Sequence, residues 1–182
     1  MIKKVKLTDC AEGPWKNGKG LTRQIAIYPH GSSLSENNFD WRLSSATILG
    51  ENQFSSFPGR NRWLIIWKGD GVFLNGLELK RHIPYHFSGE EEINCLPIGE
   101  KVIDLGLIYD PKKGSADLKV LSGQIDLKAQ GGPVFLFLAE GSGLIGTHAM
   151  SEGDFLILEN RSVHLELKDN ALAYVFSLNH SQ

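Results

Sequence analysis

Apolar residues along this chain alternate with polar ones or gather in short runs, and Gly, Pro, Asn and Asp interrupt them at close intervals. A period of two is typical of β-strands that bury one face. The pattern predicts strands at 21–28, 40–49, 62–68, 101–109, 134–139, 154–158 and 171–178. No long segment keeps a 3.6-residue apolar period, so we expect an all-β fold with few short helices.

Many short strands between tight turns must bury their apolar faces in a sandwich or a barrel, and a jelly roll is the leading expectation. A faint repeat points to two similar halves. Residues 67–72 and 139–144 each combine a strand end, a Gly-x-Gly turn and a new apolar run. The alternative remains open, because Gly-x-Gly is also a common hairpin turn in unrelated β-proteins.

Composition and charge exclude several classes of protein. With 182 residues, a net charge of -2 and a pI near 6.3, the chain lacks the basic surface that nucleic acid binding requires. We expect no membrane association and no secretion, because the basic N-terminus is not followed by an uninterrupted apolar segment. Cys10 and Cys95 form no C-x-x-C motif, and so few cysteines fit a reduced cytoplasmic location.

Three blocks in the first third of the chain closely resemble the HutD/Ves family: PWKNGKGLTR (14–23), FDWRLS (39–44) and FSSFPGRNR (54–62). The resemblance implies a two-lobed cupin, or bicupin, built from antiparallel jelly-roll β-barrels. It implies one compact unit, with lobes of about 1–110 and 111–182 packed together, in the bacterial cytoplasm. For the HutD branch it implies a link to histidine utilisation, and for Ves a link to cold and stress response. Residues 104–106 read Asp-Leu-Gly where the family pattern has Asp, an apolar residue and Asn.

Motifs for metal binding and catalysis are incomplete. The chain has no His-x-His, and a strand would separate His82 from His86 by about 13 Å, too far for one ion. Residues 13–20 resemble a phosphate-binding loop but lack the final Ser or Thr that Mg²⁺ needs. G-x-S-x-G is absent. We therefore expect no metal, no cofactor and no catalytic residue, and we lean against an enzyme.

Candidate residues for an anion pocket gather in the recognised blocks. Arg matches a carboxylate with two parallel hydrogen bonds, Trp supplies an apolar wall, and Asn orients a ligand. The candidates are Trp15, Lys16, Asn17, Arg23, Arg42, Arg60 and Arg62. Trp15 has an alternative role as core, and each Arg an alternative role as an ion-paired surface residue. We assign Trp41, Trp63 and Trp67 to the core, because Trp63, Ile65 and Trp67 alternate on one face.

Two functions remain open. The first is a binding module with a regulatory or buffering role, which captures a small anionic metabolite, a carboxylate. The second is a metal-independent epimerase or isomerase in which His86 and one of Tyr28, Tyr85, Tyr109 or Tyr174 transfer protons. A His hydrogen-bonded to Tyr inside a pocket favours the enzyme, and an Arg-lined pocket without such a base favours binding. Exposed strand edges favour a homodimer.

Overall fold

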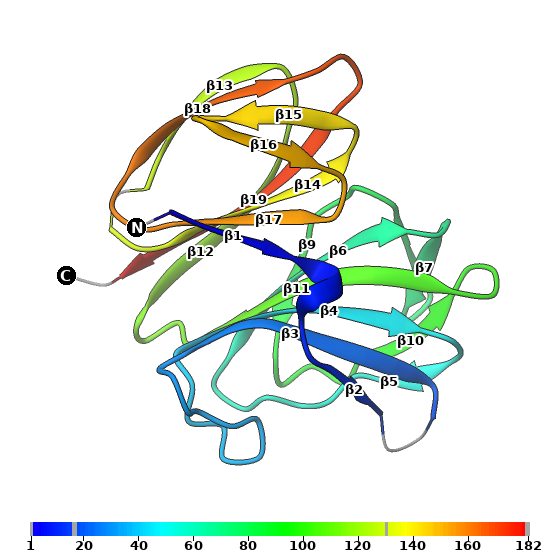
Figure 1. Cartoon of the computed structure of the whole chain (residues 1–182). Helices are drawn as coiled ribbons and strands as arrows, with labels where there is room; N and C mark the ends of the chain where they lie inside the picture. The colour runs from blue at the N-terminus through cyan, green and yellow to red at the C-terminus, as the bar shows by residue number, and fades with distance from the viewer. Residues whose placement is uncertain (1, 16–17, 130, 181–182) are drawn as a thin grey trace. The chain divides into compact units, whose positions relative to one another are not determined.

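The computed structural model describes residues 2–15, 18–129 and 131–180, and nearly all of its regular structure is β-strand (Figure 1). The only helical segment in these ranges is a single 3-10 turn, η1 (Leu7–Asp9). The prediction of an all-β chain with few short helices is confirmed. The chain divides into two compact units, Ala11–Lys112 and Met1–Cys10 with Lys113–Gln182. They are called the 11–112 unit and the 113–182 unit below.

The 11–112 unit contains two antiparallel sheets. The larger sheet has six strands, in the spatial order β2 (Glu12–Pro14), β3 (Gly20–Tyr28), β4 (Trp41–Ile48), β11 (Val102–Tyr109), β6 (Asn61–Lys68) and β9 (Tyr85–Ser88). The smaller sheet has four, in the order β5 (Asn52–Gln53), β10 (Asn94–Pro97), β7 (Gly71–Leu74) and β8 (Leu77–Lys80).

The 113–182 unit also contains two antiparallel sheets. Five strands form one sheet, in the order β1 (Ile2–Lys6), β17 (Asp154–Leu158), β14 (Val134–Glu140), β19 (Leu172–His180) and β12 (Gly114–Leu121). Four form the other, in the order β13 (Gln124–Lys128), β18 (Ser162–Leu167), β15 (Ser142–Ile145) and β16 (His148–Ser151). Strand β1 belongs to this unit, because its Lys4 pairs with Leu156 of β17. The first ten residues therefore group with residues 113–182. The sequence had instead predicted that they group with residues 11–110.

The sheets are open, so the expectation of closed jelly-roll barrels is wrong. Within the described ranges, strands β6 and β14 of the larger sheets each end at a glycine turn. After the turn the chain continues as β7 or β15 in the smaller sheet of the same unit. Gly69 (φ 92°) and Gly141 (φ 75°) adopt left-handed backbone there, which interrupts an extended hydrogen-bond ladder. The repeated Gly-x-Gly segments thus occupy equivalent places in the two units.

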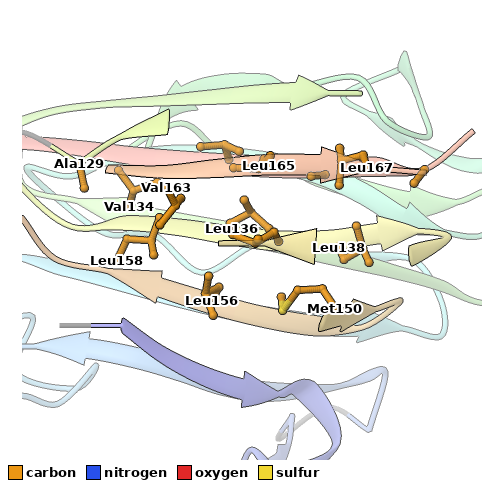
Figure 2. Packing of buried hydrophobic residues seen from close by; sticks show 14 residues of the cluster. Ala129, Val134, Leu136, Leu138, Met150, Leu156, Leu158, Val163, Leu165 and Leu167 are labelled. Atoms are coloured by element: carbon orange, nitrogen blue, oxygen red, sulfur yellow. The ribbon is translucent and has the colours of Figure 1, made fainter. Parts of the chain in front are cut away.

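The ends of the seven strands predicted from the sequence differ from those observed by at most two residues; the observed strands are β3, β4, β6, β11, β14, β17 and β19. Each unit buries its own apolar cluster. In the 113–182 unit, Leu136 and Leu138 of β14 pack in a cluster with Leu165 and Leu167 of β18 (Figure 2). In the 11–112 unit, the cluster includes Leu64 and Ile66 of β6.

Strand β6 presents apolar residues on both faces. Leu64 and Ile66 belong to the cluster on one face, and Ile65 (0% exposed) and Trp67 (9%) are buried on the other. Trp63 lies on the same face as Trp67 but is only partly buried, as is Trp41, whose ring lies 5.9 Å from that of Tyr28. The core assignment is therefore correct for Trp67, whereas Trp41 and Trp63 lie at the edge of the buried region.

Candidate functional site

A pocket of about 850 Å³ lies in the 11–112 unit. Strands β2, β3, β4, β6 and β11 of the larger sheet line it, together with the segment 52–57 that begins at β5. Four of its lining residues are ionisable: Glu12, Arg42, Arg62 and Asp104. This cavity is large enough for a small metabolite.

Strand register brings the two arginines onto one face. Ile108 of β11 pairs with Arg42 of β4 on one side and with Arg62 of β6 on the other. Paired residues of adjacent strands point to the same face of a sheet. Arg42 and Arg62, separated by nineteen intervening residues along the chain, therefore flank Ile108 in the pocket lining.

The next row of the same face contains a glycine. Gly106 pairs with Ser44 and Leu64, two residues along β11 from Ile108. A Cβ atom at Gly106 would meet only the Trp63 carbonyl oxygen, at 3.7 Å, so the space above it is open. The absence of a side chain at position 106 leaves a hollow in the pocket floor beside the arginine row.

Arg42 is anchored by neutral partners. Its Nε donates to Gln24 Oε1 at 3.0 Å, and its Nη1 donates to Ser44 Oγ at 3.1 Å. Burial lowers the pKa of Arg42 to about 10, an effect that the Asp104 carboxyl partly opposes. The guanidinium remains charged at neutral pH. Only 7% of the residue is exposed, so this is a buried cation held by uncharged hydrogen-bond acceptors.

Arg62 is enclosed by aromatic rings. Its guanidinium carbon lies 4.9 Å from the centroid of Phe87, 5.0 Å from Phe54 and 5.6 Å from Phe57. Its Nη1 donates to the Ser55 carbonyl at 3.2 Å. Burial lowers the pKa of Arg62 to about 10, with Asp104 opposing the shift and Arg42 adding to it. Cation–π contacts fix the group in place without neutralising its charge.

Asp104 of β11 is the acidic member of the site. It is 6% exposed, its Oδ1 accepts the Ala46 N–H at 2.8 Å, and its backbone carbonyl accepts the Ser45 hydroxyl at 2.7 Å. Burial raises the pKa of Asp104 to about 7, although the Ala46 hydrogen bond and the two arginines act in the opposite direction. Among the described residues, no ion pair within 4 Å joins Asp104 to either arginine. The carboxyl is thus balanced between its two protonation states near neutral pH.

Trp15 forms part of the apolar wall. Its Nε1 donates to Thr22 Oγ1 at 2.7 Å, which positions the indole against β3 in the pocket lining. The ring packs on Gly20, where a Cβ atom would lie 2.6 Å from Trp15 Cε3. Only glycine at position 20 allows this approach.

The residues predicted from the sequence separate into three groups. Trp15, Arg42 and Arg62 line the pocket. Arg23 and Arg60 do not: Arg23 forms an ion pair with Glu12, and Arg60 Nη1 lies 2.7 Å from Asp110 Oδ2. Arg60 precedes β6, which begins at Asn61, so it does not share a strand face with Arg62. Lys16 and Asn17 lie outside the described residues.

Sequence reasoning missed Asp104 as a site residue. The sequence did carry a signal for it, because Asp104 is the one charged residue in the otherwise apolar strand Val102–Tyr109. It also missed Asn52, a buried lining residue whose Nδ2 donates to the Gly50 carbonyl at 2.9 Å. The Asn52 Oδ1 atom has no hydrogen-bond partner among the described residues.

A His and Tyr pair does exist, but it does not line this pocket. His86 Nε2 lies 3.0 Å from the Tyr109 hydroxyl, and the His86 ring lies 4.6 Å from Trp63. Neither His86 nor Tyr109 is among the lining residues. Within the part of the chain that the structure describes, no group of three His, Cys, Asp or Glu residues is arranged to hold a metal ion. The same residues include no helix with the length and apolar character to span a membrane.

The all-β architecture is cupin-like, as judged from solved structures below 25% identity that share the fold. A family model described as HutD matches residues 7–175, and the chain belongs to this family. The resemblance noted in the three sequence blocks is thereby confirmed.

Bacterial proteins are among the relatives of this chain. An uncharacterised 21.2 kDa protein from the hutC 3' region of Pseudomonas putida is 35% identical over 131 residues, covering 69% of this chain and 67% of the relative. Protein Ves of Citrobacter koseri is 33% identical over 129 residues, covering 67% of this chain and 65% of the relative. A solved structure, "HutD from Pseudomonas fluorescens SBW25 (Formate condition)", has 25% identity and a TM-score of 0.87, with 100% of both chains covered.

Proposed function

We propose that the pocket of the 11–112 unit binds a small carboxylate metabolite, and that the protein acts as a binding module with a regulatory or buffering role. The observation that carries this proposal is the pair of guanidiniums, Arg42 and Arg62, on one face of the pocket. Neither takes part in an ion pair among the described residues. Buried charges are costly unless compensated, so an anion is the occupant that best stabilises the site.

The shape of the lining supports a carboxylate with an apolar body. Two guanidiniums offer planar donors to carboxylate oxygens. Trp15, Phe54 and Phe57 are among the apolar residues of the lining. The hollow at Gly106 leaves room beside the cations for the head group. Names among the relatives, HutD and the hutC 3' region, support a ligand related to histidine utilisation. We further propose that the chain is a bicupin, since each of its two units contains a large and a small antiparallel sheet. We also propose a cytoplasmic location, in keeping with a chain that has only two cysteines.

The test is an Arg62→Gln substitution, with Arg23→Gln as the matched control. Calorimetry against N-formylglutamate, urocanate, glutamate and formate identifies a ligand of the wild-type protein. Loss of one charge-assisted hydrogen-bonding partner in a desolvated site is expected to cost about 1.5 to 3 kcal/mol, or roughly 10- to 150-fold in affinity. Arg23 does not line the pocket, and its charge is already paired with Glu12, so its variant is expected to bind normally.

Thermal melts run alongside check that Arg62→Gln remains folded, because Arg62 also contacts three aromatic rings. Equal affinity of wild type and Arg62→Gln would show that Arg62 does not hold the ligand. If none of the four acids binds to the wild-type protein, the carboxylate proposal itself fails.

One observation favours a second candidate, a metal-independent isomerase or epimerase. Asp104 lies in the pocket, and its pKa of about 7 is suited to general acid–base catalysis near neutral pH. In D₂O, an enzyme of this kind exchanges the proton on the carbon next to the carboxylate of its ligand, which proton NMR detects. A binding module leaves that signal unchanged.

A further inference from the structure

The protonation state of Asp104 depends on the charged groups that surround it in the proposed pocket. Arg42 on β4 and Arg62 on β6 contribute positive charge. Cys95 on β10 also interacts with Asp104, and burial raises the pKa of this thiol to about 12, so it stays neutral. Glu12 on β2 lines the same pocket but is paired with Arg23. The pocket without ligand therefore holds two cations and one carboxyl group of variable charge.

An anion that enters this pocket changes the balance at Asp104. The carboxylate of Asp104 is 6% exposed, so water does not screen it from a new negative charge in the same cavity. Two carboxylates that share a poorly solvated site disfavour each other's ionisation, and one of them takes up a proton. The ligand lies against the guanidiniums in the proposed mode, which leaves Asp104 as the group that is protonated.

Resting on the proposed anion pocket, we propose that Asp104 takes up one proton from solvent when a carboxylate binds, so that ligand and proton bind together. The ionised Asp104 carboxylate and a hydrated proton become a neutral carboxylic acid, and no other bond changes. Its Oδ1 keeps the hydrogen bond from Ala46 N–H. The new O–H is available as a donor to the ligand. Asp104 thus makes the affinity of the pocket respond to pH.

The size of the effect follows from the groups that titrate. The pKa of Asp104 in the free protein is about 7, while those of Arg42 and Arg62 are about 10. Formate and N-formylglutamate stay ionised above pH 6. If only the protonated form of Asp104 binds them well, the apparent affinity falls about tenfold between pH 6 and pH 8. At pH 7.5, above the pKa of Asp104 in the free protein, binding takes up most of one proton per ligand.

Calorimetry measures this uptake directly. N-formylglutamate and formate are titrated into wild-type protein at pH 7.5 in Tris and in Bis-Tris, whose ionisation enthalpies differ and which are not anions. The difference in observed enthalpy gives the number of protons taken up. We expect Asp104→Asn to bind with an affinity that is constant from pH 6 to pH 8, with no proton uptake. Glu12→Gln, a carboxylate at the same pocket, is expected to keep the wild-type pH dependence.

The outcomes separate this inference from the function on which it rests. Binding of either acid without proton uptake, or with the same pH dependence in Asp104→Asn, overturns the proton coupling and leaves the anion pocket intact. Absence of binding by wild type at every pH contradicts the anion pocket itself. If Asp104→Asn does not fold, the proton count on the wild-type protein still decides.

Discussion

Replacing Asp104 by Asn tests whether a buried carboxyl destabilises the 11–112 unit at neutral pH. The amide has the shape of the carboxyl, and its oxygen still accepts the Ala46 N–H now bonded at 2.8 Å. Burial raises the pKa of Asp104 from 3.8 to about 7. Between these values the folded protein holds a proton that the unfolded chain has lost. The contribution of Asp104 to stability is therefore fully present below pH 4 and is lost as pH rises through 7.

The magnitude follows from the shift of about three pH units. Each unit corresponds to about 1.4 kcal/mol, so ionisation of Asp104 costs about 4 kcal/mol once pH exceeds 8. Between pH 5 and pH 8 we expect the free energy of unfolding of wild type to fall by about 2.5 kcal/mol relative to Asp104→Asn. Other carboxylates titrate equally in both proteins, so their effects cancel in the difference.

Tryptophan fluorescence during urea denaturation is the appropriate assay. Trp15, Trp41, Trp63 and Trp67 are the four tryptophans of the chain, and all belong to the 11–112 unit. The signal therefore reports on the unit that contains Asp104. Glu12→Gln serves as the control, since this carboxylate is exposed at its ion pair with Arg23. A stability difference that does not depend on pH, or that favours wild type more strongly as pH rises, would refute the reasoning.

Two further predictions concern packing and metal content. Gly20→Ala places a Cβ 2.6 Å from both the Thr47 carbonyl oxygen and Trp15 Cε3, so we expect the free energy of unfolding to fall by about 1 to 3 kcal/mol and the Trp15 emission to shift. Gly13→Ala is the control, because a Cβ at position 13 has no atom within 4 Å. Equal melting temperatures of the two variants would contradict this account. Protein purified without an affinity tag is expected to carry no stoichiometric transition metal by elemental analysis, and one equivalent of zinc, iron or manganese per chain would disprove that expectation.

Much of the fold was predictable because its main strands are patterned locally. Each predicted range is a short run of β-branched and apolar residues bounded by a turn residue. Asp154–Leu158, which follows Gly153, is an example. The place of β1 was not predictable. Its partner β17 lies about 150 residues away along the chain, with Lys4 opposite Leu156, and no local pattern encodes such a pairing. The open sheets likewise depend on turn geometry at Gly69 and Gly141.

The candidate site was predictable in its residue types but not in its membership. Arg23, Arg42, Arg60 and Arg62 carry the same chemistry, and the sequence alone does not separate them. What separates them is pairing: Glu12 lies opposite Arg23 across β2 and β3, and Asp110 binds Arg60. Arg42 and Arg62 instead share the cross-strand neighbour Ile108. Such a shared neighbour exists only once the register of β4, β11 and β6 is known.

Asp104 illustrates why the functional part of the site escapes sequence reasoning. Its strand, Val102–Tyr109, is buried along most of its length, so a carboxylate there opposes the local preference for apolar residues. A charge in such a strand costs stability, and it persists where something other than stability selects it. The sequence displays that conflict at position 104, but its meaning depends on Arg42 and Arg62 across the two neighbouring strands and on the hollow above Gly106. The carboxyl whose ionisation opposes folding is thus the one that gives the proposed pocket its response to protons.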